Sequence, residues 1–491
     1  MRPRETLAVA ALVVAAAALR FATIDVQSFW FDESVTVHLL RLPFGDMLSR
    51  LPDTELTPPL YYVLAWPWGA LFGTTELALR SLSALFGIAT VPVAHLVGRE
   101  LASRRAGLML AALVAFNPVL VWYSQEGRPY ALLVLTAALS LLFFTRAVRR
   151  RRARELWLWV GASILALLTH YFAAFLVVPE GLWLAWAWRP RVPALVAGGL
   201  VAAVGVALIP LAHHESAHVS AQYIQSLSLR RRLLAVPEDF VAGFVVKWDA
   251  AKETLLEAIG LAVAAAGAGI ALARTDRPAR RGALFAAGAA LAAAGVPALL
   301  AIAGTDYLNT RNLLAACVPA LAVAALGFAA TRAAGVVATA ALCAIGVAST
   351  IIVAADPTYQ RSNWRGAAHA LGPARAPRVL AVAPFEGFVD LSVYLSGLRA
   401  LPPGGAAVPE VDVVTPRNPR VGGPVVARPA NPLPPAAGFR LAERRYARDY
   451  TLLRWRADRP LRVTSRAVAR AATGVLPAAD GLLELLRPPD G

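Results

Sequence analysis

Cysteine is nearly absent from this chain: its 491 residues include only Cys317 and Cys343, and both lie within apolar stretches. Two cysteines placed in this way do not indicate a disulfide framework or a metal site, and we expect buried free thiols. Charged residues are also scarce, at 16% against 58% hydrophobic residues, which excludes an ordinary soluble protein of this length. The composition therefore predicts an integral membrane protein.

Acidic residues are outnumbered, with 31 Asp and Glu against 48 Lys and Arg, which gives a net charge of +17. The basic residues fall in short clusters between apolar segments, and this placement is typical of membrane topology rather than of nucleic-acid binding. We therefore expect no nucleic-acid partner. The heavy use of Ala, Arg, Gly and Pro suggests a bacterial genome rich in G and C, and hence a protein of the bacterial inner membrane.

Eleven apolar segments are expected to cross the membrane, with the N-terminus in the cytoplasm and the C-terminus outside. Arg2 and Arg4 precede the first segment and hold that end inside, and the arginine cluster at residues 146–154 is the strongest inside signal. The predicted spans are residues 7–24, 79–97, 108–122, 130–144, two within 156–188, 192–212, one that ends before residue 274, one that ends at residue 305, 312–332 and one that ends at residue 356.

Two domains are predicted, a membrane domain at residues 1–355 and a small soluble extracytoplasmic α/β domain at residues 356–491. The membrane domain contains an outside loop, residues 25–78, with an amphipathic interfacial helix at 35–51 and a second short helix at 60–72. The second helix has fewer than the roughly 20 residues that a span requires. In the α/β domain we expect strands at 378–383, 411–414 and 450–455 and helices at 388–395 and 478–486.

Two adjacent carboxylates, Asp32 and Glu33, follow the first predicted span and are preceded by Phe29, Trp30 and Phe31. A carboxylate at the bilayer centre costs about 2.5–3.5 kcal/mol, so we expect this pair where the span meets water, as the aromatic residues also indicate. On a helix the two side chains point about 100° apart, so one can act as a general base while the other binds or orients. The alternative is an ordinary solvated carboxylate pair near a helix start.

Two arginines, Arg128 and Arg311, each precede a helix that is predicted to descend from the outer face. A helix N-terminus favours an anion, and a guanidinium group adds a fixed charge suited to phosphate oxygens. We therefore expect an anionic headgroup to bind there. The alternative is that either arginine merely extends to the membrane interface.

The runs Phe31-Asp32-Glu33, Pro-Pro-Leu-Tyr-Tyr at 58–62, Gln-Glu-Gly-Arg-Pro-Tyr at 125–130 and Thr-His-Tyr at 169–171 together resemble the GT-C glycosyltransferases. The closest branch contains protein O-mannosyltransferases and lipid A aminoarabinose transferases, and the resemblance covers residues 1–355. It implies inverting transfer of a sugar, such as mannose or another hexose or pentose, from a polyprenyl-phosphate donor to an extracytoplasmic lipid, glycan or protein acceptor.

The resemblance also implies roles for single residues, with Asp32 as the base, Glu33 as its support, and Arg128 and Arg311 as contacts to the donor phosphate. Two positions depart from the family pattern: Thr57 stands where many relatives have a basic residue or His, and Asn312 stands where an Arg-Tyr pair is common. Six further residues of the same motifs and loops are candidates for substrate binding: Tyr61, Glu126, Tyr130, His170, Tyr171 and Tyr307.

No cofactor is assigned from the sequence, and a divalent metal is left open. Glu126 and His170 are weak candidate ligands, because a lone interfacial His is more often a hydrogen-bonded structural residue. A second group, His213, His214, Glu215 and His218, has metal-ligand spacing but lies in a loop without evident fixed geometry. The rival functions are a transporter or flippase of a polyprenyl-linked sugar, which would place ionisable residues near the membrane midplane, and a noncatalytic scaffold.

Overall fold

The computed structural model describes residues 3–218, 224, 228–243, 252–383, 387–416, 431–447, 449–473, 475 and 483–489. It divides into two compact units. The membrane unit comprises Met1–Ile24 and Leu39–Ile351, and the C-terminal unit comprises Asp25–His38 and Ile352–Gly491. Residues 25–38, which the sequence placed in a loop of the membrane domain, therefore group with the C-terminal part of the chain.

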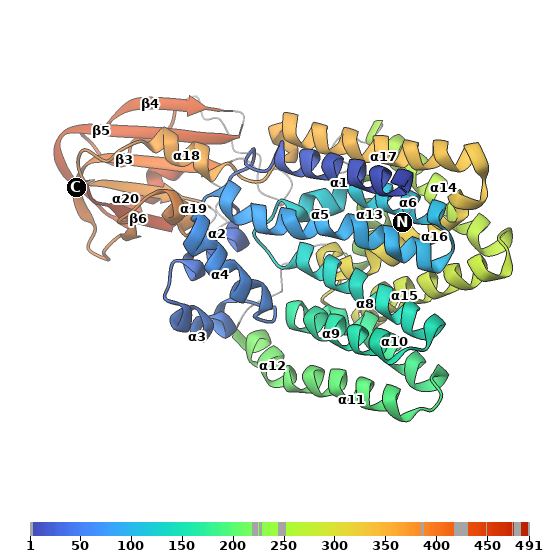
Figure 1. Cartoon of the computed structure of the whole chain (residues 1–491). Helices are drawn as coiled ribbons and strands as arrows, with labels where there is room; N and C mark the ends of the chain where they lie inside the picture. The colour runs from blue at the N-terminus through green and yellow to red at the C-terminus, as the bar shows by residue number, and fades with distance from the viewer. Residues whose placement is uncertain are drawn as a thin grey trace. The chain divides into compact units, whose positions relative to one another are not determined.

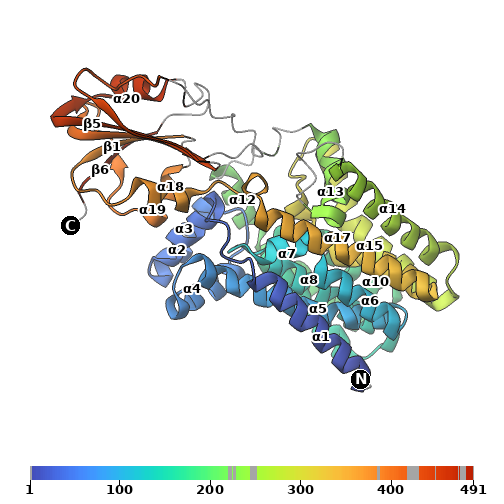
Figure 2. The same cartoon turned by 90° about the horizontal axis from the view of Figure 1, so that it is seen from above.

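The membrane unit is helical, and its long helices lie side by side along a common direction (Figures 1 and 2). Helices satisfy their backbone hydrogen bonds internally, as a bilayer requires. Its elements are α1 (Pro3–Phe21), α3 (Phe44–Thr54), α4 (Leu60–Phe72), α5 (Glu76–Leu101), α6 (Arg104–Phe116), α7 (Pro118–Ser124), α8 (Tyr130–Arg150), α9 (Ala153–Thr169), η1 (Tyr171–Ala173), α10 (Ala174–Ala187), α11 (Val192–Ala207), α12 (Ile209–His218), α13 (Leu229–Ala242), α14 (Lys252–Ala273), α15 (Arg277–Ile302), η4 (Thr310–Ala316), α16 (Cys317–Ala330) and most of α17 (Arg332–Ala355).

Among the described residues, seven helices are long and apolar enough to cross a membrane, or eight if α6 and α7 form one bent span. All eleven predicted spans coincide with helical structure, but three helices do not reach the length and apolarity of a span. Helix α1 carries Arg4, Glu5 and Arg20, and α9 and α10 have only 17 and 14 residues. The prediction of a polytopic helical membrane protein is confirmed, with fewer membrane-length helices than the sequence suggested.

Helices α6 and α7 meet at an angle of 56°. Asn117 lies at the break, and its side-chain oxygen accepts a hydrogen bond of 3.0 Å from the Leu120 N–H, which starts α7. Pro118 has no N–H to donate to the carbonyl of Val114, so the helical hydrogen-bond ladder stops here. The break redirects the chain toward residues 124–128, which contain Arg128.

Small residues allow close helix packing within the membrane unit. A Cβ atom added to Gly327 of α16 would lie 1.8 Å from the carbonyl oxygen of Gly267 of α14, so only glycine permits this approach. Such contacts provide van der Waals packing between helices in the lipid bilayer, where burial of apolar surface gives no driving force for association. Cys317 is buried and Cys343 is partly buried, and both are free thiols, as predicted.

The helices between α1 and α5 differ in part from the prediction. Helix α4 has the predicted bounds, and its 13 residues are too few to cross a bilayer. The single amphipathic helix predicted at 35–51 is wrong, because the structure has two helices there, α2 (Phe31–Leu40) and α3. Pro43 lies just before α3, and a proline disfavours helical backbone in the residue that precedes it.

The C-terminal unit contains a six-stranded sheet in the order β2-β6-β1-β3-β5-β4. Strands β1 and β3 are parallel, and the other neighbours are antiparallel. Its elements are most of α2, η5 (Pro357–Tyr359), α18 (Trp364–Leu371), β1 (Arg378–Val382), α19 (Gly387–Tyr394), β2 (Arg399–Ala400), β3 (Ala406–Pro416), β4 (Arg440–Tyr446), β5 (Tyr450–Val463), α20 (Ser465–Ala472) and β6 (Leu483–Arg487).

Helices cover both faces of this sheet (Figure 2). Val379 and Ala381 of β1 pack in the cluster that includes α20, whereas Leu380 and Val382 pack in the cluster that includes α18 and α19. This alternation is the period of two that a strand imposes on its side chains. The predicted strands at 411–414 and 450–455 lie within β3 and β5, the one at 378–383 corresponds to β1 with one extra residue, and the predicted helix at 388–395 corresponds to α19.

The helix predicted at residues 478–486 is wrong over its described part. Residues 478–482 lie outside the described residues, and Leu483–Arg487 form β6, which pairs antiparallel with β1. A short apolar run such as Leu483-Glu484-Leu485-Leu486 fits either period, and its pairing with a central strand decides the outcome.

Candidate active site

Asp32 and Glu33 lie in the first turn of α2, and the structure gives them different surroundings. Glu33 is fully buried, and its carboxylate lies 3.4 Å from a guanidinium nitrogen of Arg361. The Arg361 guanidinium also lies over the Trp30 ring, 5.2 Å from its centroid. Asp32 is partly exposed. The pair therefore divides into one carboxylate held by a cation and one that solvent can reach.

Arg128 directly precedes the N-cap residue of α8, as the sequence predicted. It forms a two-point ion pair with Glu55, with 2.6 Å between Nη1 and Oε1 and 2.6 Å between Nη2 and Oε2. Both side chains are buried. Glu55 was not among the predicted site residues, and the sequence offered no signal for it beyond an acid between two short helices.

The same arginine lies 6.0 Å from the centroid of the Tyr62 ring. Burial raises the pKa of Tyr62 well above its usual value, so its hydroxyl stays protonated at neutral pH. Tyr61 lies alongside, and its hydroxyl is 3.2 Å from Ser83 Oγ, which in turn donates to the carbonyl of Arg128 at 3.3 Å. The predicted candidate Tyr61 is thus connected to the backbone at Arg128.

Arg311 lies at the start of the segment that leads into α16, but this start is a 3₁₀ turn, η4. The Asn309 side chain accepts a hydrogen bond of 3.2 Å from the Arg311 N–H and caps the turn. The Arg311 guanidinium lies 6.0 Å from the centroid of the Tyr130 ring. Tyr307 contributes its carbonyl, which accepts from Asn312 Nδ2 at 2.8 Å.

The segment before η4 is fixed by Arg232, which was not among the predicted site residues. Its guanidinium pairs with both carboxylate oxygens of Asp306, at 2.7 and 2.5 Å, and donates to the Leu308 carbonyl at 3.0 Å. This pairing holds the pKa of Asp306 below its usual value. The Arg232 side chain is buried, and the ion pair with Asp306 compensates its charge.

His170 joins the two arginines in one cluster. Burial, together with the charges of Arg311 and Arg128, lowers the pKa of His170 to about 3. Its Nδ1 accepts a hydrogen bond of 3.2 Å from the Phe172 N–H, so the proton of the neutral ring is placed on Nε2. The His170 ring lies 6.2 Å from that of Tyr130. The structure therefore brings together four predicted residues, Arg128, Tyr130, His170 and Arg311.

The remaining predicted candidates lie at the edge of this cluster or beyond it. Glu126 is buried, and its Oε1 accepts from Trp122 Nε1 at 2.9 Å. The Tyr171 hydroxyl donates to Glu215 Oε2 at 2.9 Å. Glu126 and His170 do not share a metal-ligand group with a third His, Cys, Asp or Glu among the described residues.

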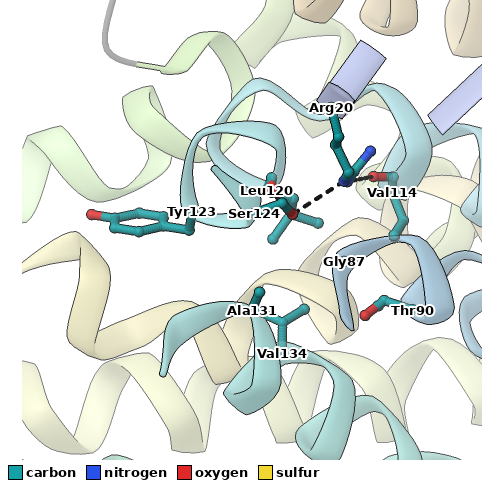
Figure 3. A pocket seen from close by; sticks show the side chains of 9 residues that line it. All are labelled: Arg20, Gly87, Thr90, Val114, Leu120, Tyr123, Ser124, Ala131 and Val134. Carbon is teal, nitrogen blue, oxygen red and sulfur yellow. Dashed lines mark hydrogen bonds between the residues drawn. The ribbon is translucent and has the colours of Figure 1, made fainter. Parts of the chain in front are cut away.

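A buried arginine, Arg20, reaches the end of α6 from α1 (Figure 3). Its guanidinium donates to the Ala115 carbonyl at 2.9 Å and to Ser124 Oγ at 3.1 Å. These acceptors are neutral, and the carbonyls at this end of α6 are those that the break at Pro118 leaves without helical donors. The side chain lines a small cavity formed by Arg20, Gly87, Thr90, Val114, Leu120, Tyr123, Ser124, Ala131 and Val134.

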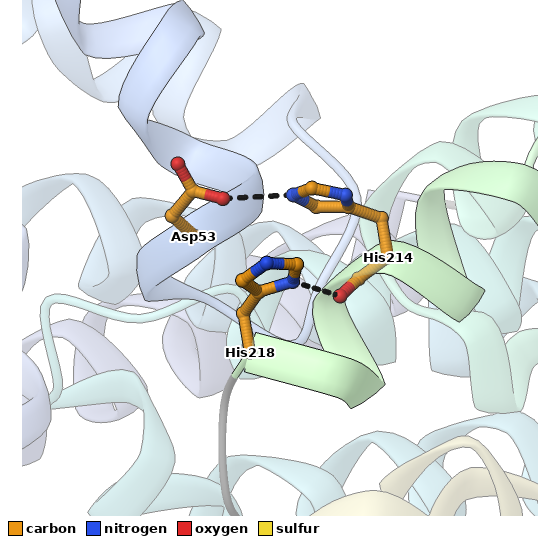
Figure 4. A group of neighbouring side chains, drawn as sticks. All are labelled: Asp53, His214 and His218. Atoms are coloured by element: carbon orange, nitrogen blue, oxygen red, sulfur yellow. Dashed lines mark hydrogen bonds and ion pairs between the residues drawn. The ribbon is translucent and has the colours of Figure 1, made fainter.

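Within the part of the chain that the structure describes, one group of three side chains could share a metal ion: Asp53 of α3 with His214 and His218 of α12 (Figure 4). His214 Nε2 lies 2.7 Å from Asp53 Oδ1, and the two imidazole rings stack with their centroids 4.1 Å apart. The hydrogen bond with His214 holds the pKa of Asp53 below its usual value. Of the four residues with metal-ligand spacing in the sequence, these two histidines join the group, whereas Glu215 is turned toward Tyr171.

A segment of the chain matches a known family. Residues 57–213 match the family of dolichyl-phosphate-mannose-protein mannosyltransferases. An uncharacterized protein of Aquifex aeolicus (strain VF5) is 26% identical over 159 residues, which cover 32% of this chain and 31% of the relative. The match thus spans less than a third of the length of that relative.

Two crystal structures of ArnT from Cupriavidus metallidurans have a similar fold. The apo form matches with a TM-score of 0.55 and 14% identity, covering 91% of this chain and 97% of that chain. The form bound to undecaprenyl phosphate matches with a TM-score of 0.52 and 14% identity, covering 96% and 99%. At this identity the likeness concerns the fold, and it confirms the fold class that the sequence motifs predicted.

Proposed function

Because the chain has the fold of the GT-C glycosyltransferases, we propose that it transfers a sugar from a polyprenyl-phosphate donor to an acceptor hydroxyl, with inversion at the anomeric carbon. The cluster of Arg128, Arg311, Tyr130 and His170 carries this proposal, because it offers an anion site beside aromatic rings in the membrane unit. The family match at residues 57–213 includes three of these four residues. The matched family of mannosyltransferases and the similar ArnT fold give no support to the transporter or flippase alternative.

Asp32 is the proposed base. In the reaction it removes the proton from the acceptor hydroxyl as that oxygen bonds to the anomeric carbon, and the bond from this carbon to the phosphate oxygen breaks. Polyprenyl phosphate leaves with the electron pair. Because Asp32 is partly exposed while Glu33 is buried against Arg361, Asp32 is the carboxylate that an acceptor can approach. Glu33 is assigned a supporting role.

The departing phosphate gains negative charge, and fixed cations stabilise it. Arg311 and Arg128 supply two cations, and the ion pair with Glu55 holds the Arg128 side chain in place. His170 is neutral and carries its proton on Nε2, so it can donate a hydrogen bond to a phosphate or sugar oxygen. Undecaprenyl phosphate bound to the similar ArnT fold supports a lipid of this class as the donor.

The orientation that we propose places the N-terminus in the cytoplasm and the carboxylate pair outside the bacterial inner membrane. The arginine-rich segments at residues 99–105 and 146–154, where one helix ends and the next begins, are the support for this orientation, since positively charged connections are retained inside. The acceptor is an extracytoplasmic lipid, glycan or protein that presents a hydroxyl group.

We also propose that Asp53, His214 and His218 hold a divalent metal ion. Two histidines four residues apart on α12 and one carboxylate from α3 give two nitrogen ligands and one oxygen ligand, a set that suits zinc. The metal would join α3 to α12 and so steady the end of α3, where Glu55 follows. Its contribution is structural, and no step of the transfer passes through it.

The test supplies purified protein in lipid nanodiscs with radiolabelled polyprenyl phosphates that carry mannose, another hexose or a pentose. Asp32→Asn is expected to lower turnover by about 10²- to 10⁴-fold while donor binding is retained, because a general base contributes this much. Asp46→Asn, which changes an exposed carboxylate of α3, serves as the matched control. Equal turnover in Asp32→Asn and the control would exclude Asp32 as the base.

A further inference from the structure

Two segments of the C-terminal unit hold residues 25–38, which contain the carboxylate pair. The first segment is residues 361–365. The Trp364 N–H donates to Ser28 Oγ at 3.1 Å, and Ser28 Oγ donates to the Ser362 carbonyl at 2.7 Å. The Arg361 N–H donates to Gln27 Oε1 at 3.0 Å, while its guanidinium pairs with Glu33. These contacts fix the chain just before α2 and the first turn of the helix.

The second segment is helix α19. The Tyr394 hydroxyl accepts a hydrogen bond of 2.9 Å from the Phe29 N–H. Ser34 Oγ donates to Asp390 Oδ1 at 2.6 Å, and both residues are buried. One turn further along α2, His38 Nε2 lies 2.9 Å from Ser392 Oγ and 3.2 Å from the Val389 carbonyl oxygen. Helix α19 therefore contacts α2 along one side.

These contacts determine how α2 is rotated about its own axis. Ser34 and His38 are four residues apart and so lie on the same face, which packs on α19. At about 100° per residue, Glu33 lies a quarter turn away, toward Arg361, and Asp32 lies nearly opposite Ser34. With two of its faces held, α2 presents Asp32 on the face that is left partly exposed.

Helix α2 has only 10 residues, and an isolated helix of this length is marginal in water. Its orientation must therefore come from tertiary contacts. We propose that the C-terminal unit is a positioning element of the transferase, in which Arg361 and Asp390 fix the rotation of α2 and so present the Asp32 carboxylate to the acceptor hydroxyl. This inference rests on the proposed function, in which Asp32 is the base. It gives the C-terminal unit a role in the transfer reaction itself.

The experiment compares Arg361→Met and Asp390→Asn in the full chain with two matched controls in the same unit, Arg466→Met on α20 and Asp458→Asn on β5. We expect the first two variants to lower kcat by about 10- to 100-fold, because a misplaced catalytic group costs this much. The KM for the donor should stay unchanged. Arg361→Lys keeps the positive charge, so it should recover part of the kcat that Arg361→Met loses. Such a recovery would show that Arg361→Met does not act through folding alone.

A second readout follows α2 directly and needs no turnover. A nitroxide label is attached to Phe31→Cys, an exposed position at the start of α2, in a background with Cys317→Ala and Cys343→Ala. The label should become more mobile in Arg361→Met and Asp390→Asn but not in the controls. If the wild type turns over and Arg361→Met and Asp390→Asn equal the controls in both readouts, the positioning role is overturned. If the wild type shows no turnover but the label is more mobile in Arg361→Met and Asp390→Asn, the proposed function is overturned and the fixation of α2 is supported.

Discussion

Arg128 and Glu55 form a buried two-point ion pair, with both nitrogen–oxygen distances at 2.6 Å. Each charge is removed from water, so each depends on the other for compensation. The pair therefore has two separable roles, one in stability and one in holding the guanidinium where a phosphate would bind.

Glu55→Leu is expected to lower stability by about 3–5 kcal/mol, because it leaves the Arg128 charge buried without its partner. The double variant Glu55→Leu with Arg128→Met removes both charges and should recover most of the loss in thermal midpoint. The double variant should still fail to bind a polyprenyl-phosphate donor. Donor binding by the double variant at the wild-type affinity would show that Arg128 makes no contact with the phosphate.

His170 should make stability depend on pH between about 6.5 and 3. Its pKa is about 3 in the folded chain and about 6.5 in the unfolded chain, so below pH 6.5 only the unfolded chain takes up the proton. Its contribution to stability is therefore complete above pH 6.5 and is lost as the pH falls toward 3. His170→Gln should flatten the curve of thermal midpoint against pH, whereas His369→Gln, at an exposed histidine of α18, should leave the curve unchanged.

Local patterns in the sequence were sufficient for much of the fold. Apolar runs located the long helices, alternation located β1, β3 and β5, and the proline after Arg128 marked the start of α8. The helix predicted where β6 lies was wrong, because the five residues of this strand show no periodicity that excludes a helix. The sequence predicted one helix at residues 35–51, although Pro43 marks the point where the structure separates α2 from α3.

The partners of the site residues could not be predicted, because they lie far away along the chain. Glu55 is 73 residues from Arg128, and Arg361 is 328 residues from Glu33. No local pattern links such pairs, and only the packing of the fold brings them together. For the same reason the sequence placed residues 25–38 in a membrane loop, whereas their hydrogen bonds to Ser362, Asp390 and Tyr394 tie them to the C-terminal unit.

Arg20→Met should destabilise the break between α6 and α7. The Ala115 carbonyl would lose the Arg20 donor, and an unsatisfied buried group costs about 1–3 kcal/mol, whereas the Ser124 hydroxyl would still donate to the Leu120 carbonyl. Since Ser124 leads directly into residues 125–128, the affinity for the donor should also fall. Thr90→Val, which changes another residue of the same cavity, should leave both the thermal midpoint and the donor affinity close to wild type. An unchanged midpoint in Arg20→Met would refute the capping role.

Zinc binding at Asp53, His214 and His218 should require both imidazoles, because each supplies one nitrogen ligand. Isothermal titration of the metal-stripped full chain with zinc chloride measures this directly. His214→Ala should abolish the binding, and His213→Ala, which removes the neighbouring exposed histidine outside the group, should not. Zinc should also raise the thermal midpoint of the wild type, because it would join α3 to α12. Equal zinc affinity in the two histidine variants would place the metal elsewhere, and the exposed hydrogen bond between His214 and Asp53 would then be an ordinary surface contact.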